Sequence, residues 1–239
     1  MKPLLVLVTL AGCAVTPITN RLKPGEEALV VVVGEGTDGA TDLFAAPAEG
    51  GQFFQLTFTR APESNPKLAP SGTLLAFVRQ GGESKPELVV FDLLGGTERV
   101  LRLEAAPLRL GWFPGGDTVA VATTEGARTV ALGGGALVAV AAGARADSLS
   151  YDRVGKPAFG SIRPCRAGGL CVMSDGGEET TLAAGAADGC RWGDKALAYI
   201  REGKIEVRPL GGGRVRQPTW TKAPAHLRQP THQPGSDAR

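Results

Sequence analysis

The sequence predicts an all-β fold made of repeated units of short antiparallel strands. The first landmark is an apolar strand with a small central residue, and its five copies centre on Val30, Ala76, Ala120, Ala158 and Ala198. The second is a Gly-Gly turn, whose second glycines are Gly51, Gly96, Gly135, Gly177 and Gly213. Both series keep a step of about 36 to 46 residues, which suits a four-stranded propeller blade. The sequence therefore predicts a single β-propeller of five four-stranded blades, with six blades as the alternative.

The best-preserved unit spans residues 65–101. A Pro-Ser-Gly turn at 70–72 precedes the apolar run 73–78, and a polar loop leads to a third run at 87–92. Glycine adopts positive φ at little cost, so Gly95-Gly96 suits a hairpin turn into a last run at 97–101.

This unit also resembles a known family. Residues 66–77 are similar to the Pro-x-x-Ser-Pro-Asp-Gly-x-x-Ile-Ala-Phe signature of TolB-type, WD-like propeller repeats. Ser71 replaces the family's Asp, Ala69 replaces its Ser, and the preceding Gln55-Leu56-Thr57 resembles the family's Leu-Thr. The resemblance covers residues 22–220 as a pattern and implies a propeller fold there.

The N-terminus resembles the signal of a bacterial lipoprotein. The apolar run 4–10 is too short to span a bilayer, which takes about 20 residues, but it suits a signal peptide. Leu10-Ala11-Gly12-Cys13 resembles a lipobox. The resemblance implies a signal peptide at 1–12, acylation such as palmitoylation at Cys13, and a lipidated tether at 13–21. An ordinary secretory signal and a buried apolar strand are the alternatives.

A lipoprotein signal implies a location in the bacterial cell envelope, anchored to the membrane by the N-terminal lipid. Ala14 follows the cysteine where an Asp would favour the inner membrane, so the outer membrane, facing the periplasm, is expected. An orientation toward the cell exterior stays open. The expected partner is an envelope protein or the cell wall.

Residues 221–239 are predicted to be a disordered polar tail. They contain three prolines, both histidines and few apolar groups. Because no strand is expected there, the ring is expected to close through residues 17–22 or to be irregular.

Three cysteines follow the lipobox. Cys165 and Cys171 flank a short loop between two strands, where a hairpin disulfide can form in an oxidising compartment. Cys190 then stays free or buried, although pairing with Cys190 is the alternative.

The sequence predicts no catalytic site, cofactor or metal. Residues 22–220 contain no His, which excludes the Ser/His/Asp and Cys/His arrangements of nucleophilic catalysis there. Both histidines lie in the tail, far along the chain from the cysteines, which argues against a zinc site. Asp38 and Asp42 lack the further acidic ligands of a calcium loop and fit a solvated hairpin turn better. A net charge of +2 without a basic aromatic block argues against nucleic acid.

Trp112 and Trp192 occupy corresponding places at the ends of first strands. For Trp112 and Trp192, a role in packing between blades is favoured over a role in a binding face. Together these patterns predict a non-catalytic envelope lipoprotein whose propeller is a protein-binding or scaffolding module. The alternatives are a glycan-binding or carbohydrate-active propeller, with paired acidic residues on one face, and a degenerate propeller kept only for assembly.

Overall fold

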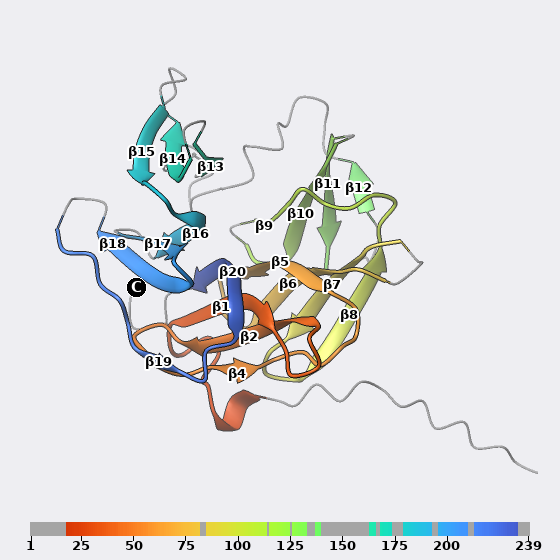
Figure 1. Cartoon of the computed structure of the whole chain (residues 1–239). Helices are drawn as coiled ribbons and strands as arrows, with labels where there is room; N and C mark the ends of the chain where they lie inside the picture. Colours follow the sequence, from red (N-terminus) through yellow and green to blue (C-terminus); the bar gives the residue numbers. More distant parts are fainter. Residues whose placement is uncertain are drawn as a thin grey trace, which may run out of the picture.

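The computed structural model describes residues 18–81, 85–113, 115–124, 126–132, 137–139, 163–165, 168–173, 179–192, 196–209 and 213–233. Within these ranges the chain consists of strands and connections, apart from the short 3-10 turn η1 (Ile18–Asn20). No helix in this part of the chain is long and apolar enough to cross a membrane. The sheets are arranged about a common centre (Figure 1). Nearest to it lie the strands β5 (Glu63–Leu68), β9 (Arg109–Trp112), β16 (Ala187–Trp192) and β20 (Ala225–Gln233).

The first sheet has the strand order β20-β1-β2-β4. It contains β1 (Leu29–Glu35), β2 (Thr41–Pro47), β4 (Phe54–Gln55) and, from the far end of the chain, β20 (Ala225–Gln233). Beside it, β3 (Gly51–Gln52) forms a short parallel pair with β19 (Trp220–Thr221). Residues from both ends of the chain therefore build the same sheet.

The second and third sheets follow the predicted four-strand pattern in chain order. The second contains β5 (Glu63–Leu68), β6 (Leu74–Arg79), β7 (Glu87–Asp92) and β8 (Thr97–Arg102). The third contains β9 (Arg109–Trp112), β10 (Thr118–Thr123), β11 (Gly126–Ala131) and β12 (Leu137–Ala139). The predicted runs at 73–78, 87–92 and 97–101 each match one strand of the second sheet.

The described parts of the remaining two sheets have three strands each. One contains β13 (Arg163–Pro164), β14 (Leu170–Met173) and β15 (Glu179–Ala183), and the other β16 (Ala187–Trp192), β17 (Ala196–Arg201) and β18 (Lys204–Pro209). After β18, Arg216 forms an isolated bridge with Val207. The strand predicted around Ala158 lies outside the described residues, and the count of five blades stays a prediction.

The core lies between neighbouring sheets, which explains the continuous apolar runs. A strand covered on both faces must be apolar throughout, unlike the alternating strand of a half-exposed sheet. Ala76, Ala120 and Ala198, the small central residues of β6, β10 and β17, are at most 1% exposed. Separate apolar clusters join the first sheet to the second, the second to the third, and the first to the last. The all-β propeller class is thus confirmed.

The C-terminal segment corrects the predicted disordered tail. Residues 225–233 form β20, which pairs antiparallel with β1 from Ala225, opposite Glu35, to Gln233, opposite Leu29. The predicted tail is wrong for these residues, and closure through residues 17–22 is wrong as well. The physical reason is that β20 supplies the missing innermost strand of the first sheet, and its backbone is satisfied by β1 rather than by water.

The predicted tether meets the folded part near η1. Its residues 13–17 lie outside the described residues, whereas Ile18–Asn20 form η1. Leu22, which follows directly, is 1% exposed and packs into the cluster between the first and second sheets. The chain is therefore fixed to the propeller from this residue onward.

Candidate binding face and inner-strand relay

Trp112 serves packing between sheets. It ends β9, is 8% exposed and lies in the apolar cluster shared with the second sheet. Its indole Nε1–H donates a hydrogen bond of 2.8 Å to the carbonyl oxygen of Lys67 on β5. These contacts agree with the favoured packing interpretation of Trp112, and a binding face that includes it stays a prediction. Trp192 ends β16, but its side chain lies outside what the structure describes.

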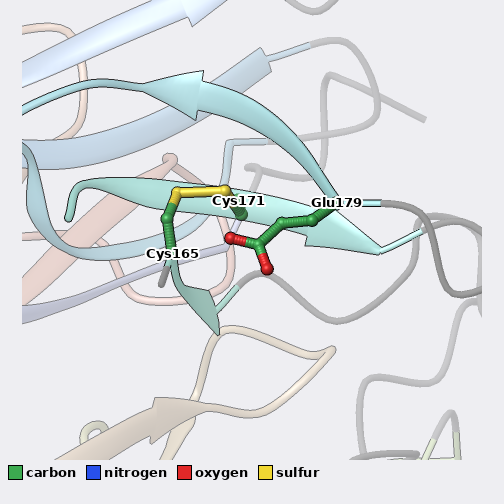
Figure 2. Close-up of side chains that lie close together, drawn as sticks. All are labelled: Cys165, Cys171 and Glu179. Carbon is green, nitrogen blue, oxygen red and sulfur yellow. A yellow bond between two sulfur atoms is a disulfide. The ribbon is translucent and has the colours of Figure 1, made fainter. Parts of the chain in front are cut away.

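The cysteines pair as predicted. Cys165 and Cys171 form a disulfide across the β13–β14 hairpin (Figure 2). Cys190 is a free thiol on β16. Among the described residues, the ligand atoms of Cys165, Cys171 and Glu179 lie within 4.8 Å of one another, the one such group of three. Because the two sulfurs are bonded to each other, this group offers no thiolate to a metal. The predicted lipid-bearing Cys13 lies outside the described residues.

Three innermost strands share an unusual backbone feature. Asn65 on β5, Asp188 on β16 and Gln229 on β20 have positive φ values of 54°, 34° and 47°. At each of them the register with the neighbouring strand shifts, as at a β-bulge. Residues other than glycine rarely adopt positive φ, and each such residue costs about 1–3 kcal/mol unless the surroundings hold it. Something must therefore stabilise these three bulges.

The bulged residues stabilise one another through hydrogen bonds between sheets. The Gln229 N–H donates to Asp188 Oδ2 at 3.0 Å, and the Asn65 N–H donates to Gln229 Oε1 at 2.6 Å. The Asn65 Nδ2 group donates to the Pro107 carbonyl oxygen at 3.4 Å. We call this series the inner-strand relay. It links the last sheet to the first, the first to the second, and the second to the connection before the third.

The relay escaped prediction, although the sequence carries a signal for it. Gln229-Pro230 repeats Asn65-Pro66, which opens the best-preserved unit. In both pairs the residue before proline has positive φ and forms the bulge. The second such pair, Gln229-Pro230, could therefore have indicated an innermost strand near the C-terminus.

The chemistry near these strands does not favour nucleophilic catalysis. Burial raises the pKa of the Cys190 thiol to about 12, so this thiol stays protonated at neutral pH. Burial lowers the pKa of Lys67, and nearby Arg109 acts in the same direction. Because the thiolate is the nucleophilic form of cysteine, a thiol that stays protonated is a poor nucleophile.

Exposed apolar side chains mark one face of the propeller. Leu108 and Phe58 are 57% and 55% exposed, the largest values among the large hydrophobic residues that the structure describes. Phe58 lies on the β4–β5 connection and Leu108 on the β8–β9 connection, and both connections lead from an outermost strand to the next innermost strand. They therefore lie at the same end of the strands. We call this end the Phe58 face.

The other exposed apolar groups lie elsewhere. Leu94, 49% exposed, is on the β7–β8 turn at the opposite end of β8 from Leu108. Val100, 45% exposed, lies within β8 itself. Leu94 thus offers a matched control on the opposite face.

Asp42 corrects the predicted solvated turn. Asp38 does lie in an exposed turn, where its Oδ1 accepts a hydrogen bond from the Ala40 N–H at 3.0 Å. Asp42, however, is fully buried, and its Oδ2 accepts a hydrogen bond from Gln55 Nε2 at 2.8 Å. A Cβ at Gly36 would lie 2.3 Å from Asp42 Oδ2, so the turn closes over this carboxyl only because residue 36 is glycine.

Comparisons with known proteins support the fold. No protein-family model and no curated protein matches the chain. Among solved structures, TolB from Acinetobacter baumannii is 17% identical, with a TM-score of 0.52 over 87% of this chain and 67% of that one. A chain of a nidogen/laminin complex is 10% identical, with a TM-score of 0.59 over 86% of this chain and 98% of that one. At these identities the likeness establishes a TolB-like propeller fold and no more.

Proposed function

We propose that this chain is a non-catalytic, lipid-anchored protein of the bacterial cell envelope whose propeller binds another envelope protein. The observation that carries the proposal is the pair of exposed apolar side chains on the Phe58 face, Phe58 and Leu108. Aromatic and apolar side chains at the centre of a contact commonly supply most of the affinity between proteins. The two connections that carry them join consecutive sheets, so one partner can cover both.

The expected contribution of these side chains follows from their exposure. Fully burying a Phe or Leu side chain yields about 1.5–3 kcal/mol, and each of these is already about half buried. Covering both would therefore contribute about 2–3 kcal/mol, or roughly 30- to 150-fold in affinity. That is enough for removal of either side chain to be measurable.

The described chemistry supports a binding role over an enzymatic one. His226 is exposed, and its Nε2 lies 3.4 Å from Glu35 Oε2. Among the described residues, the contacts of His226 include no Ser, Thr or Cys side chain. The two buried carboxyl groups, Asp42 and Glu63, are 0% and 1% exposed and cannot act as an accessible catalytic pair on a substrate. One matched structure belongs to a nidogen/laminin complex, an assembly of two proteins, which is consistent with a propeller used for binding.

The proposed location rests on the lipobox. Acylation at Cys13 would hold the propeller at the outer membrane, facing the periplasm, since several acyl chains anchor a protein stably. The Cys165–Cys171 disulfide is consistent with such an oxidising compartment. Acyl labelling of the protein and of Cys13→Ala tests the anchor, and an unlabelled, freely soluble wild-type protein would refute it.

Affinity capture after chemical crosslinking tests the binding function. We expect the anchored protein to retain the same envelope partner in repeated captures, and Phe58→Ser and Leu108→Ser each to reduce its recovery at least fivefold. Leu94→Ser, on the opposite face, is the matched control and should leave recovery unchanged. Equal recovery with all three variants would contradict a role for the Phe58 face.

A further inference from the structure

Two buried carboxyl groups meet at the seam between the first and second sheets. Asp42 lies in β2 and is fully buried, and Glu63 begins β5 and is 1% exposed. β2 and β5 contact each other, so the two groups belong to adjoining sheets. Buried acidic side chains are rare unless they are paired with a partner that offsets their charge.

Each carboxyl group is satisfied through one oxygen only. Glu63 Oε1 accepts hydrogen bonds from Arg79 Nε at 3.0 Å and from Thr59 Oγ1 at 3.2 Å, and Asp42 Oδ2 accepts one from Gln55. The second oxygens, Asp42 Oδ1 and Glu63 Oε2, are buried without a hydrogen-bond partner. A buried acceptor left unpaired costs about 1–3 kcal/mol, and more when it is charged.

Thr57 lies between the two groups. Its side chain lies close enough to lower the pKa of both carboxyls, and its Oγ1 accepts a hydrogen bond from the Leu43 N–H at 2.9 Å. A hydroxyl has a single proton to donate, so it satisfies one carboxyl at a time. The seam is short of one donor.

The charges around the seam do not balance. Arg79 donates to Glu63 and also forms two hydrogen bonds of 2.9 and 2.7 Å with Glu98 on β8. One guanidinium from β6 thus faces both Glu63 and Glu98, while Asp42 acts on Glu63 and Asp38 acts on Asp42 as further negative charges. An uncompensated buried carboxylate is unfavourable, so a proton or a cation must offset the excess charge.

We propose that the folded protein takes up one exchangeable proton on the buried carboxyls of Asp42 and Glu63, which makes this seam a pH-sensitive contact between the first and second sheets. A proton supplies the donor that the unpaired oxygens lack and removes one negative charge. A calcium ion fits less well, because it takes about six to eight oxygen ligands and the seam offers two carboxyls and one hydroxyl. The proposal concerns stability and is independent of the proposed binding function.

The direction of the pH effect follows from the folded state's affinity for this proton. Burial raises the pKa of Glu63 from 4.5 to about 7, despite the opposing effects of Thr57 and Arg79. Burial also raises the pKa of Asp42, and Asp38 adds to the effect. The folded protein therefore binds more protons than the unfolded chain, and the stability present below pH 4.5 is lost as the pH rises toward 7.

The magnitude is set by the size of the shift. Each unit of pKa difference changes the unfolding equilibrium constant about tenfold, so Glu63 raises this constant roughly 300-fold over its whole titration, and about 80-fold between pH 4.5 and 7. Above pH 7 the contribution of Glu63 levels off. The seam therefore stabilises the folded protein most at acidic pH.

Denaturant unfolding of the full chain from pH 4.5 to 8 tests the proposal. Relative to wild type, Glu63→Gln should remove most of the rise in the unfolding constant, which is roughly 140-fold over this pH range. Glu104→Gln, at an exposed residue paired with Lys85, is the matched control and should keep the wild-type pH profile. A Glu63→Gln profile that parallels wild type would overturn the proposal.

A second measurement covers the case in which Glu63→Gln fails to fold. Carbon NMR of the Glu and Asp carboxyls in the wild-type protein should show one Glu titrating near pH 7, assigned to Glu63 by its loss or shift in Asp42→Asn. Titration of every Glu near 4.5 would overturn the proposal. Stabilisation by calcium or magnesium in wild type, and not in Asp42→Asn, would assign the seam to a metal instead and equally overturn it.

Discussion

Gln229 is the residue on which the closure of the ring depends most directly. Its side chain caps the Asn65 N–H at 2.6 Å, while its own N–H is capped by Asp188 at 3.0 Å. Replacing Gln229 with Ala removes the first hydrogen bond and leaves the second in place. Because Asn65 is half-buried, its N–H loses a partner that water only partly replaces.

The expected loss can be worked out from this geometry. An unpaired, largely buried N–H costs about 1–3 kcal/mol, so Gln229→Ala should raise the unfolding constant about 5- to 150-fold. Backbone strain adds little to the difference in the free energy of unfolding between wild type and Gln229→Ala, because positive φ is unfavourable for both Gln and Ala. The effect should appear in the denaturation midpoint without a change in the denaturant slope.

Chemical denaturation of wild type, Gln229→Ala and Arg228→Ala measures the effect. Arg228 is the matched control because it is exposed on the same strand, and its replacement should change stability by no more than about 0.5 kcal/mol. Limited proteolysis should also cut Gln229→Ala faster within residues 222–233. Equal stability of the two variants would refute the role of the relay in closing the ring.

Removal of residues 225–239 deletes β20 and should abolish cooperative unfolding, as measured by circular dichroism; a truncated chain that still unfolds in one sharp transition would contradict closure by β20. Trp112→Phe loses the hydrogen bond to the Lys67 carbonyl oxygen and should cost about 1–2 kcal/mol in denaturant unfolding, whereas partner recovery should not change. Replacing both Cys165 and Cys171 with Ala removes the disulfide and should lower the free energy of unfolding by about 2 kcal/mol. The free energy of unfolding of this variant should then be the same in reducing and in oxidising buffer.

The sequence was most informative where strands are covered on both faces. Runs such as 73–78 and 87–92 have four consecutive buried apolar residues because neighbouring sheets cover both of their faces. The Cys165–Cys171 pair was also predictable, since its residues face each other across one hairpin. Local pattern and local geometry decided these features.

The features that escaped prediction depend on contacts between distant residues. β20 has few apolar residues, and polar side chains on other sheets hold its bulge, as Asp188 does for Gln229. Asp42 is buried only because Gln55 and Gly36 close over it. Such partners are 6 to 41 residues away in the chain, and no local periodicity reveals them.

A photo-crosslinking amino acid placed at position 58 tests the central claim most directly, because it reports what touches the Phe58 face in living cells. The claim predicts a discrete adduct with one envelope protein at position 58, the same adduct at position 108, and none at position 94 on the opposite face. Adducts of equal yield at all three positions, or none at positions 58 and 108, would contradict it.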